Sequence, residues 1–225
     1  MIGIISDIHG NYPALEAVLK KLDAAGCNRI ISLGDVSGYY CMVNQCIEEL
    51  RERSIVNIMG NHDSYIVYNR RCERSYTVNV CLDYQREILT EANIGWLKLS
   101  VPFIRENGIW MVHGGWSDYV DEYVTDFSFL DKKNEDIKIY MSGHTHIQKR
   151  VDGESAVYLN PGAVGQPRDH IASAAYAIID DNGMIYLERA EYDIDHIVYE
   201  MKRAGFPERL SSCLYSGVRI GEDRK

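Results

Sequence analysis

Five short apolar runs in this chain end in the same way, with glycine beside histidine, aspartate or asparagine. The runs begin near residues 2, 30, 55, 109 and 137. The polar residues that follow them are Asp7, His9, Asp35, Asn61, His62, Asp63, His113, His144 and His146. Because ligands bind open α/β sheets at the carboxyl ends of the strands, the pattern predicts one site assembled from distant segments.

Strands and amphipathic helices alternate in the first sixty residues, which favours an α/β fold with parallel strands. Pro13 suits the first turn of a helix, and Gly26 suits its end. The pattern predicts strands over 2–6, 29–33 and 55–59, and helices over 13–25 and 43–53.

The rest of the chain is more varied. Residues 64–99 and 194–216 read as mostly helical, and 109–113 and 137–141 as further strands. After residue 147, DG and NG turns separate alternating runs, which is typical of two β-hairpins. We find no repeat, low-complexity segment or linker, so we expect one α/β domain over residues 1–225.

The composition excludes several classes of protein. The formal net charge of -9 disfavours binding to extended nucleic acid, which calls for basic surfaces. No apolar run approaches the ~18 residues that a membrane helix needs. The six cysteines show no CxxC pair and no disulfide framework, and the chain opens on a strand without a leader. We therefore expect a cytoplasmic protein without membrane contact.

The spacing of the polar residues has a physical reason. Asp7 and His9 stand two residues apart, as do His144 and His146, and in an extended segment such residues point to the same side. Carboxylate, imidazole and amide groups without thiolate suit divalent Mn, Fe, Zn, Mg or Ni. Any one of these residues alone would be an ordinary turn residue, but the ordered set is typical of a metal site.

Taken in order, these motifs resemble the calcineurin-like metallophosphoesterase superfamily, and most closely its small bacterial and archaeal phosphodiesterase branch. The segments from Gly34 to Tyr39 and from Asn160 to Arg168 add to the likeness, which spans nearly the whole chain. The resemblance implies an α/β fold of four layers, in which a double β-sheet sandwich is flanked by helices.

The resemblance also implies a site with two divalent metal ions and a hydroxide between them that attacks phosphorus. One ion would take Asp7, His9 and His146. The other would take Asn61, His113 and His144, and Asp35 would bridge both. His62 would face the leaving group as a proton donor, and Asp63 would orient its imidazole ring.

The sequence also departs from the family pattern. Protein phosphatases of this superfamily carry an arginine soon after the second motif, but Asp35 is followed by Val36-Ser37-Gly38-Tyr39. Tyr40-Cys41 replaces the usual Gly-Pro. Arg168 is a candidate for substrate binding, and a surface ion pair is an equal alternative for it.

The missing arginine favours a singly charged diester over a dianionic monoester. We therefore predict a phosphodiesterase for a small phosphate ester, such as a cyclic nucleotide or a dinucleoside phosphate. A phosphomonoesterase or protein phosphatase, and a noncatalytic interaction module on the same fold, remain as alternatives. A DNA nuclease is disfavoured because the chain is short and acidic. The oligomeric state stays open.

Overall fold

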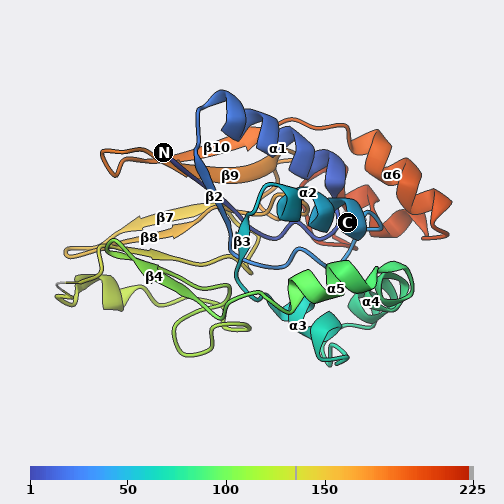
Figure 1. Ribbon diagram of the computed structural model, residues 1–225, viewed down its shortest axis with the longest axis horizontal. Helices are drawn as coiled ribbons and strands as arrows, with labels where there is room; N and C mark the ends of the chain where they lie inside the picture. Colours follow the sequence, from blue (N-terminus) through green and yellow to red (C-terminus); the bar gives the residue numbers. More distant parts are fainter. Residues whose placement is uncertain (135, 223–225) are drawn as a thin grey trace.

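The computed structural model describes residues 1–134 and 136–222, and this part of the chain folds into two five-stranded sheets and six α-helices (Figure 1). The first sheet has the strand order β10 (Ile185–Ala190), β9 (Ala174–Ile179), β1 (Ile2–Ile5), β2 (Arg29–Ser32) and β3 (Val56–Asn57). The second has the order β4 (Ile104–Glu106), β5 (Ile109–Met111), β6 (Ile139–Met141), β8 (Val157–Asn160) and β7 (Lys149–Asp152).

Both sheets are mixed, with parallel strands in the middle and antiparallel pairs at the edges. In the first sheet β1, β2 and β3 are parallel, whereas β9 runs antiparallel to β1 and β10. In the second, β5, β6 and β8 are parallel, and β4 and β7 close the edges as antiparallel strands. The carboxyl ends of the parallel strands therefore lie along one edge of each sheet.

The helices cover the first sheet and one end of the molecule. They are α1 (Tyr12–Ala24), α2 (Val43–Glu52), α3 (Asn61–Val67), α4 (Tyr76–Ile88), α5 (Glu91–Leu97) and α6 (Ile194–Arg203). Helix α1 packs on β9 and β10, α6 packs on α1, and α3, α4 and α5 gather at one end (Figure 1). Asn11 caps the start of helix α1, because its side chain accepts a hydrogen bond from the Ala14 amide.

Alternation along the strands creates two separate cores. In β1 the side chain of Ile5 packs among the helices, whereas that of Ile4 points into the layer between the two sheets. The layer between the sheets also contains Ile31, Met111 and Leu159. This apolar layer fixes the two sheets against each other, and so fixes the loops at their carboxyl ends.

The outer face of the second sheet carries a row of aromatic residues in register. Trp110, Tyr140 and Tyr158 are direct neighbours on β5, β6 and β8. They pack in one cluster with Trp116 and with the short 3-10 helix η1 (Ser128–Asp131). On this face a loop and a 3-10 turn take the place that α-helices occupy over the first sheet.

The two β-hairpins predicted after residue 147 and the double sheet flanked by helices are confirmed. Some helices and strands end at other residues than predicted. The C-terminal helix ends at Arg203, and two 3-10 turns follow it, η2 (Glu208–Leu210) and η3 (Ser212–Tyr215). Gly205 adopts a left-handed conformation just after the helix, which ends it there. No helix in the described residues is apolar over enough turns to cross a membrane.

Candidate metal centre

The loops that follow β1, β2, β5 and β6 meet at the shared edge of the two sheets, together with the start of α3. Backbone hydrogen bonds join them: the Asp7 amide donates to the Gly34 carbonyl at 3.0 Å, and the Gly143 amide to the His113 carbonyl at 2.9 Å. Asp7 also connects the sheets, because its Oδ2 accepts from the His144 amide at 3.1 Å. All seven predicted ligands are buried at this point.

A first cluster consists of Asp7, His9 and His146. The Nε2 atoms of His9 and His146 lie 3.0 Å apart, and Asp7 Oδ1 lies 3.4 Å from the latter. Nδ1 of His9 donates to the Ser37 carbonyl at 2.8 Å, and Nδ1 of His146 to the Gln166 carbonyl at 2.6 Å.

A backbone carbonyl can only accept, so each Nδ1 carries the proton and each Nε2 of the neutral ring presents a lone pair. Two lone pairs therefore face each other across 3.0 Å. Asp7 Oδ1, which has no hydrogen-bond partner among the described atoms, points to the same place. Three buried electron-pair donors around one point fit a cation, which is the arrangement that histidine ligands with a fixed outer nitrogen supply.

A second cluster contains Asn61, His113 and His144. Nδ1 of His113 donates to the Leu33 carbonyl at 2.9 Å, and its Nε2 lies 3.2 Å from Asn61 Oδ1. The ring of His144 lies 5.2 Å from that of His113, measured between centroids. His144 Nε2 is buried and has no hydrogen-bond partner within the described part of the chain. This set also fits a cation.

Asp35 lies between the two clusters. Its Oδ1 accepts from the His62 amide at 2.8 Å, which fixes the carboxylate. Its Oδ2 lies 3.7 Å from His9 Nε2 and 3.4 Å from His113 Nε2, so it faces both clusters at once. This is the place in which a bridging ligand would stand.

The backbone at these residues is strained. Five of the ligands adopt left-handed φ angles between 53° and 64°, which side chains with a Cβ atom rarely adopt: Asp7, His9, Asp35, His144 and His146. Gly60 is required for a different reason, since a Cβ atom there would collide with the Asp35 carboxylate. Hydrogen bonds between the loops that follow the strands of the two sheets hold this backbone in place.

The electrostatics of the site keep most of its imidazoles neutral. Burial lowers the pKa of His9 and His146 well below the ordinary value, and that of His144 to about 3. Burial also acts on His113, but the Asp35 carboxylate outweighs it and raises the pKa to about 9. A neutral imidazole is the form that binds a metal ion, so the site favours that form at most of its histidines.

His62 and Asp63 have different surroundings. The His62 ring lies 4.8 Å from that of His9 and 5.0 Å from that of Tyr39, and burial lowers its pKa to about 4. Its Nδ1 has no hydrogen-bond partner among the described atoms. Asp63 instead accepts from the amide and hydroxyl of Ser37, each at 2.9 Å, and from Asn57.

This arrangement differs from the expectation that Asp63 orients the His62 ring. The Asp63 carboxylate stands at the third position of α3, where it ties the start of this helix to Ser37 and Asn57. It therefore positions His62 through the backbone of α3. The two residues lie next to each other in the sequence, but their side chains leave the helix in different directions.

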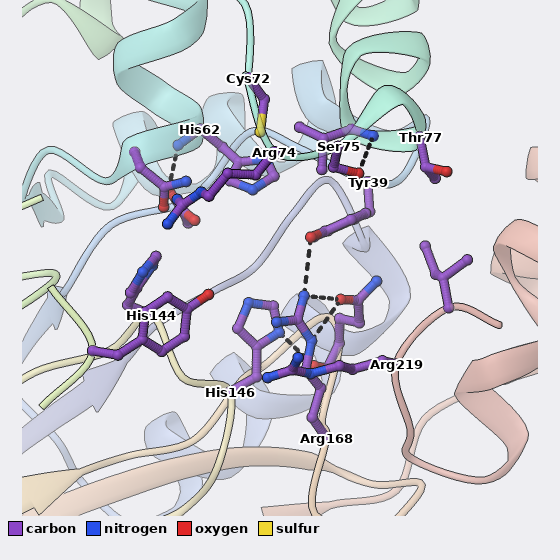
Figure 2. Close-up of a pocket in the computed structure, with 16 residues that line it drawn as sticks. Tyr39, His62, Cys72, Arg74, Ser75, Thr77, His144, His146, Arg168 and Arg219 are labelled. Atoms are coloured by element: carbon purple, nitrogen blue, oxygen red, sulfur yellow. Dashed lines mark hydrogen bonds between the residues drawn. The ribbon is translucent and has the colours of Figure 1, made fainter. Parts of the chain in front are cut away.

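A cavity of about 460 Å³ opens beside the two clusters (Figure 2). His62 and Arg74 lie on one side of it, and His146, Arg168 and Arg219 on the other. Arg168 donates to the Tyr39 hydroxyl at 3.0 Å and to Gln166 Oε1 at 2.6 Å. The structure thus places Arg168 in the cavity and gives it neutral partners, in contrast to the alternative of a surface ion pair.

Several residues of the site were not predicted from the sequence. Arg74, Tyr123 and Arg219 line the cavity, and the ring of Tyr123 lies 4.1 Å from that of His144. None of these three belongs to a motif, so the sequence carries no local signal for them. Gln166 could have been found, because it stands in the loop next to Arg168 that resembles the family.

The protein has two mixed sheets flanked by helices, and buried histidines and aspartates gather at the edge that the sheets share. This fold and this site together define a metal-binding α/β enzyme of the metallophosphoesterase architecture. The model of the calcineurin-like phosphoesterase superfamily domain matches residues 1–183, and the chain belongs to this superfamily. The family predicted from the motifs is confirmed. The protein is accordingly a hydrolase that acts on phosphoester bonds.

The chain is similar over its length to proteins from archaea and bacteria. It is 30% identical to the uncharacterized protein MJ0912 of Methanocaldococcus jannaschii, over 96% of this chain and 98% of that protein. The crystal structure of a metallophosphoesterase from Sphaerobacter thermophilus is 28% identical with a TM-score of 0.81, covering 96% of this chain and 99% of that one. The hypothetical protein PH1004 of Pyrococcus horikoshii shares the fold, at 20% identity and a TM-score of 0.85 over 96% and 99% of the two chains.

Proposed function

We propose that the protein is a phosphodiesterase that requires two divalent metal ions and hydrolyses a small phosphate ester, of the cyclic nucleotide or dinucleoside phosphate class. The observation that carries the metal requirement is the pair of Nε2 lone pairs of His9 and His146, which face each other at 3.0 Å. A buried arrangement of this kind is unfavourable without a cation between the two rings.

The residues divide into two ligand sets that share Asp35. Asp7, His9 and His146 would hold one ion, and Asn61, His113 and His144 the other. When bound, such a pair of ions lowers the pKa of a water molecule between them and neutralises charge on the phosphoryl oxygens. Mn, Fe, Zn, Ni and Mg are all compatible with these oxygen and nitrogen donors.

The remaining residues of the cavity act on the ester itself. His62 has an Nδ1 atom without a partner in the described residues and lines the cavity, so we assign to it the protonation of the leaving oxygen. Burial lowers the pKa of His62 to about 4, and this role requires that the bound anionic ester raise the pKa again. Asp63 holds the start of α3 and thereby the position of His62. Arg168, fixed by Tyr39 and Gln166, would bind a phosphoryl oxygen with its guanidinium group.

A second candidate function is that of a phosphomonoesterase. Arg168 supports it, because a guanidinium group held in the cavity by neutral partners would also suit a dianionic monoester. The rates with p-nitrophenyl phosphate and bis-p-nitrophenyl phosphate, measured on one preparation, distinguish the two. We expect the diester to be turned over faster.

The direct test uses purified protein reconstituted with Mn²⁺. Hydrolysis of bis-p-nitrophenyl phosphate is expected, and Asn61→Ala should abolish it because one ligand set loses a donor. His196→Ala is the matched control, since His196 is an exposed histidine on α6 that does not line the cavity. Absence of turnover with every ion of a panel of Mn²⁺, Fe²⁺, Zn²⁺, Ni²⁺ and Mg²⁺ would contradict the proposal.

We further infer that the protein works on a small-molecule ester in the cytoplasm. The six cysteines form no disulfide in the described part of the chain, which is consistent with a reducing compartment. Localisation of a tagged protein by cell fractionation checks this inference.

A further inference from the structure

The C-terminal segment supplies part of the cavity wall. Arg219 and Ile220 line the same cavity as His62, His144 and His146. Both stand well beyond residue 183, where the match to the superfamily domain ends. The match to the superfamily domain therefore does not extend to this part of the wall.

The segment is held against the loop that carries Arg168. Gly217 lies so close to the backbone of Ile171 that a Cβ atom would clash there, and it has a φ of 61°. Its carbonyl accepts from the His170 amide at 2.9 Å, and the next residue, Val218, is buried. Arg219 follows directly, so its position in the cavity is set by backbone packing.

A second connection runs through Tyr40. Its hydroxyl lies 3.9 Å from Cys213 Sγ in the C-terminal segment and accepts from Gln166 Nε2 at 3.2 Å. Gln166 in turn accepts from Arg168. The C-terminal segment and Arg168 are thus parts of one connected structure, and Tyr40, the residue that departs from the usual Gly-Pro, joins them.

The charges in the cavity are unbalanced. Arg74 pairs with Asp121, but Arg168 contacts only the neutral Gln166 and Tyr39 through its side-chain hydrogen bonds. Within the described residues, the polar contact given for Arg219 is that of its backbone amide, which donates to Glu222 Oε2 at 3.3 Å, and its guanidinium group has no ion pair there. In a chain with a net charge of -9, two guanidinium groups in one cavity that form no ion pair with a carboxylate in residues 1–134 and 136–222 indicate a site for an anion.

We propose that Arg219 binds a second phosphate group of the substrate, in addition to the phosphate that is hydrolysed and that Arg168 would contact. This inference rests on the proposed function, because it assumes that the hydrolysed phosphate lies at the buried ligand clusters. Arg219 is exposed at the rim of the cavity, whereas the histidine and aspartate donors are buried. Arg219 is therefore placed to contact a group at some remove from the reacting phosphorus, and it selects esters that carry more than one phosphate.

The test compares two substrates that differ by one phosphate: a dinucleoside monophosphate, and the same dinucleotide with an added 5′-phosphate. With Mn²⁺-loaded protein we expect kcat/KM to be about tenfold or more higher for the phosphorylated dinucleotide, as a charged hydrogen-bonded pair provides. Arg219→Gln should remove most of this preference. Arg209→Gln, which removes a charge from the same C-terminal segment outside the cavity, should keep it.

The outcomes separate this inference from the proposed function. Hydrolysis of bis-p-nitrophenyl phosphate with equal kcat/KM for both dinucleotides would overturn the inference and leave the diesterase assignment intact. Chromatography of the products shows which bond breaks, because loss of the 5′-phosphate alone would identify a monoesterase.

If neither dinucleotide is hydrolysed, the role of Arg219 is tested by measuring the affinity for phosphate compounds. Calorimetry of the Mn²⁺-loaded protein should give a higher affinity for pyrophosphate than for phosphate, and Arg219→Gln should reduce the difference by about tenfold. Equal affinities in the wild-type protein, or an unchanged difference in Arg219→Gln beside Arg209→Gln, would contradict the role of Arg219.

Discussion

The two ligand clusters of this protein use similar donors in different surroundings. In the first, Asp7 brings a carboxylate, and the rings of His9 and His146 are both fixed by carbonyl groups of the backbone. In the second, Asn61 brings only a neutral amide. His144 lies at the cavity, 3.6 Å from Asp121 and against the ring of Tyr123.

The difference indicates that the two ligand sets bind their metal ions with different strength. A buried set with one carboxylate and two fixed rings is preorganised and strongly attracts a cation. A set with a neutral amide in place of the carboxylate attracts it less. Two of its side chains, Asn61 and His144, line the cavity, whereas only His146 of the first set does. We expect the first ion to be bound more tightly and the second to exchange more readily.

Asp35→Asn should have the largest effect, because this carboxylate faces both clusters. We expect kcat to fall about ten-thousandfold or more, because the catalytic residues of one site act together and the loss of one disables the others. Elemental analysis should find both ions depleted. Full occupancy of both sites in the variant would contradict the bridging position of Asp35.

The comparison itself is tested by His146→Ala beside His144→Ala. Both should lower kcat by about a thousandfold, since each removes a ligand. Their metal content should differ: His144→Ala should keep one tightly bound ion after dialysis against a weak chelator, and His146→Ala should lose this ion. The same content in both variants would show that the clusters bind with equal strength.

His62→Ala should slow the reaction without removing metal. Loss of a proton donor should lower kcat about a hundredfold for an ester with an alkoxide leaving group. The loss should be much smaller for bis-p-nitrophenyl phosphate, because p-nitrophenolate leaves without protonation. An equal loss with both esters would show that His62 does not protonate the leaving group.

Asp63→Asn should have the smallest effect of these changes. The amide group would face donors from Ser37 or Asn57, which costs about 1–3 kcal/mol of folding free energy and shifts the start of α3. We expect about a tenfold lower kcat. Asp23→Asn, at an exposed ion pair with Arg53, should change the free energy of unfolding by less than about 1 kcal/mol in the same denaturant titration.

Much of the site could be predicted from the sequence because its ligands follow directly after strands. A residue one to four positions beyond a buried strand has little freedom to lie elsewhere, so the positions of Asp7, His9 and Asp35 follow from those of β1 and β2. The hairpins after residue 147 were equally predictable, since their turns carry DG and NG.

The parts that could not be predicted depend on long-range packing. Arg74 reaches the cavity from the segment before α4, and Arg219 reaches it from the C-terminal segment. Neither arginine has sequence neighbours that would predict its place in the cavity. The bonds of Asp63 depend on where Ser37 and Asn57 lie after folding. The Asp63 side chain points toward Ser37 and Asn57 and not toward the His62 ring, and no sequence motif encodes this direction.

The left-handed backbone at five of the ligands has a consequence for the history of this fold. Each such residue costs about 1–2 kcal/mol relative to a relaxed backbone, and glycine would remove most of that cost. A descendant that had lost its chemistry would gain thermal stability by accepting glycine or asparagine at Asp7, His9 or His144. Retention of aspartate and histidine there in related chains would therefore record selection for catalysis, whereas retention of Ile4 or Met111 would record only the need to fold.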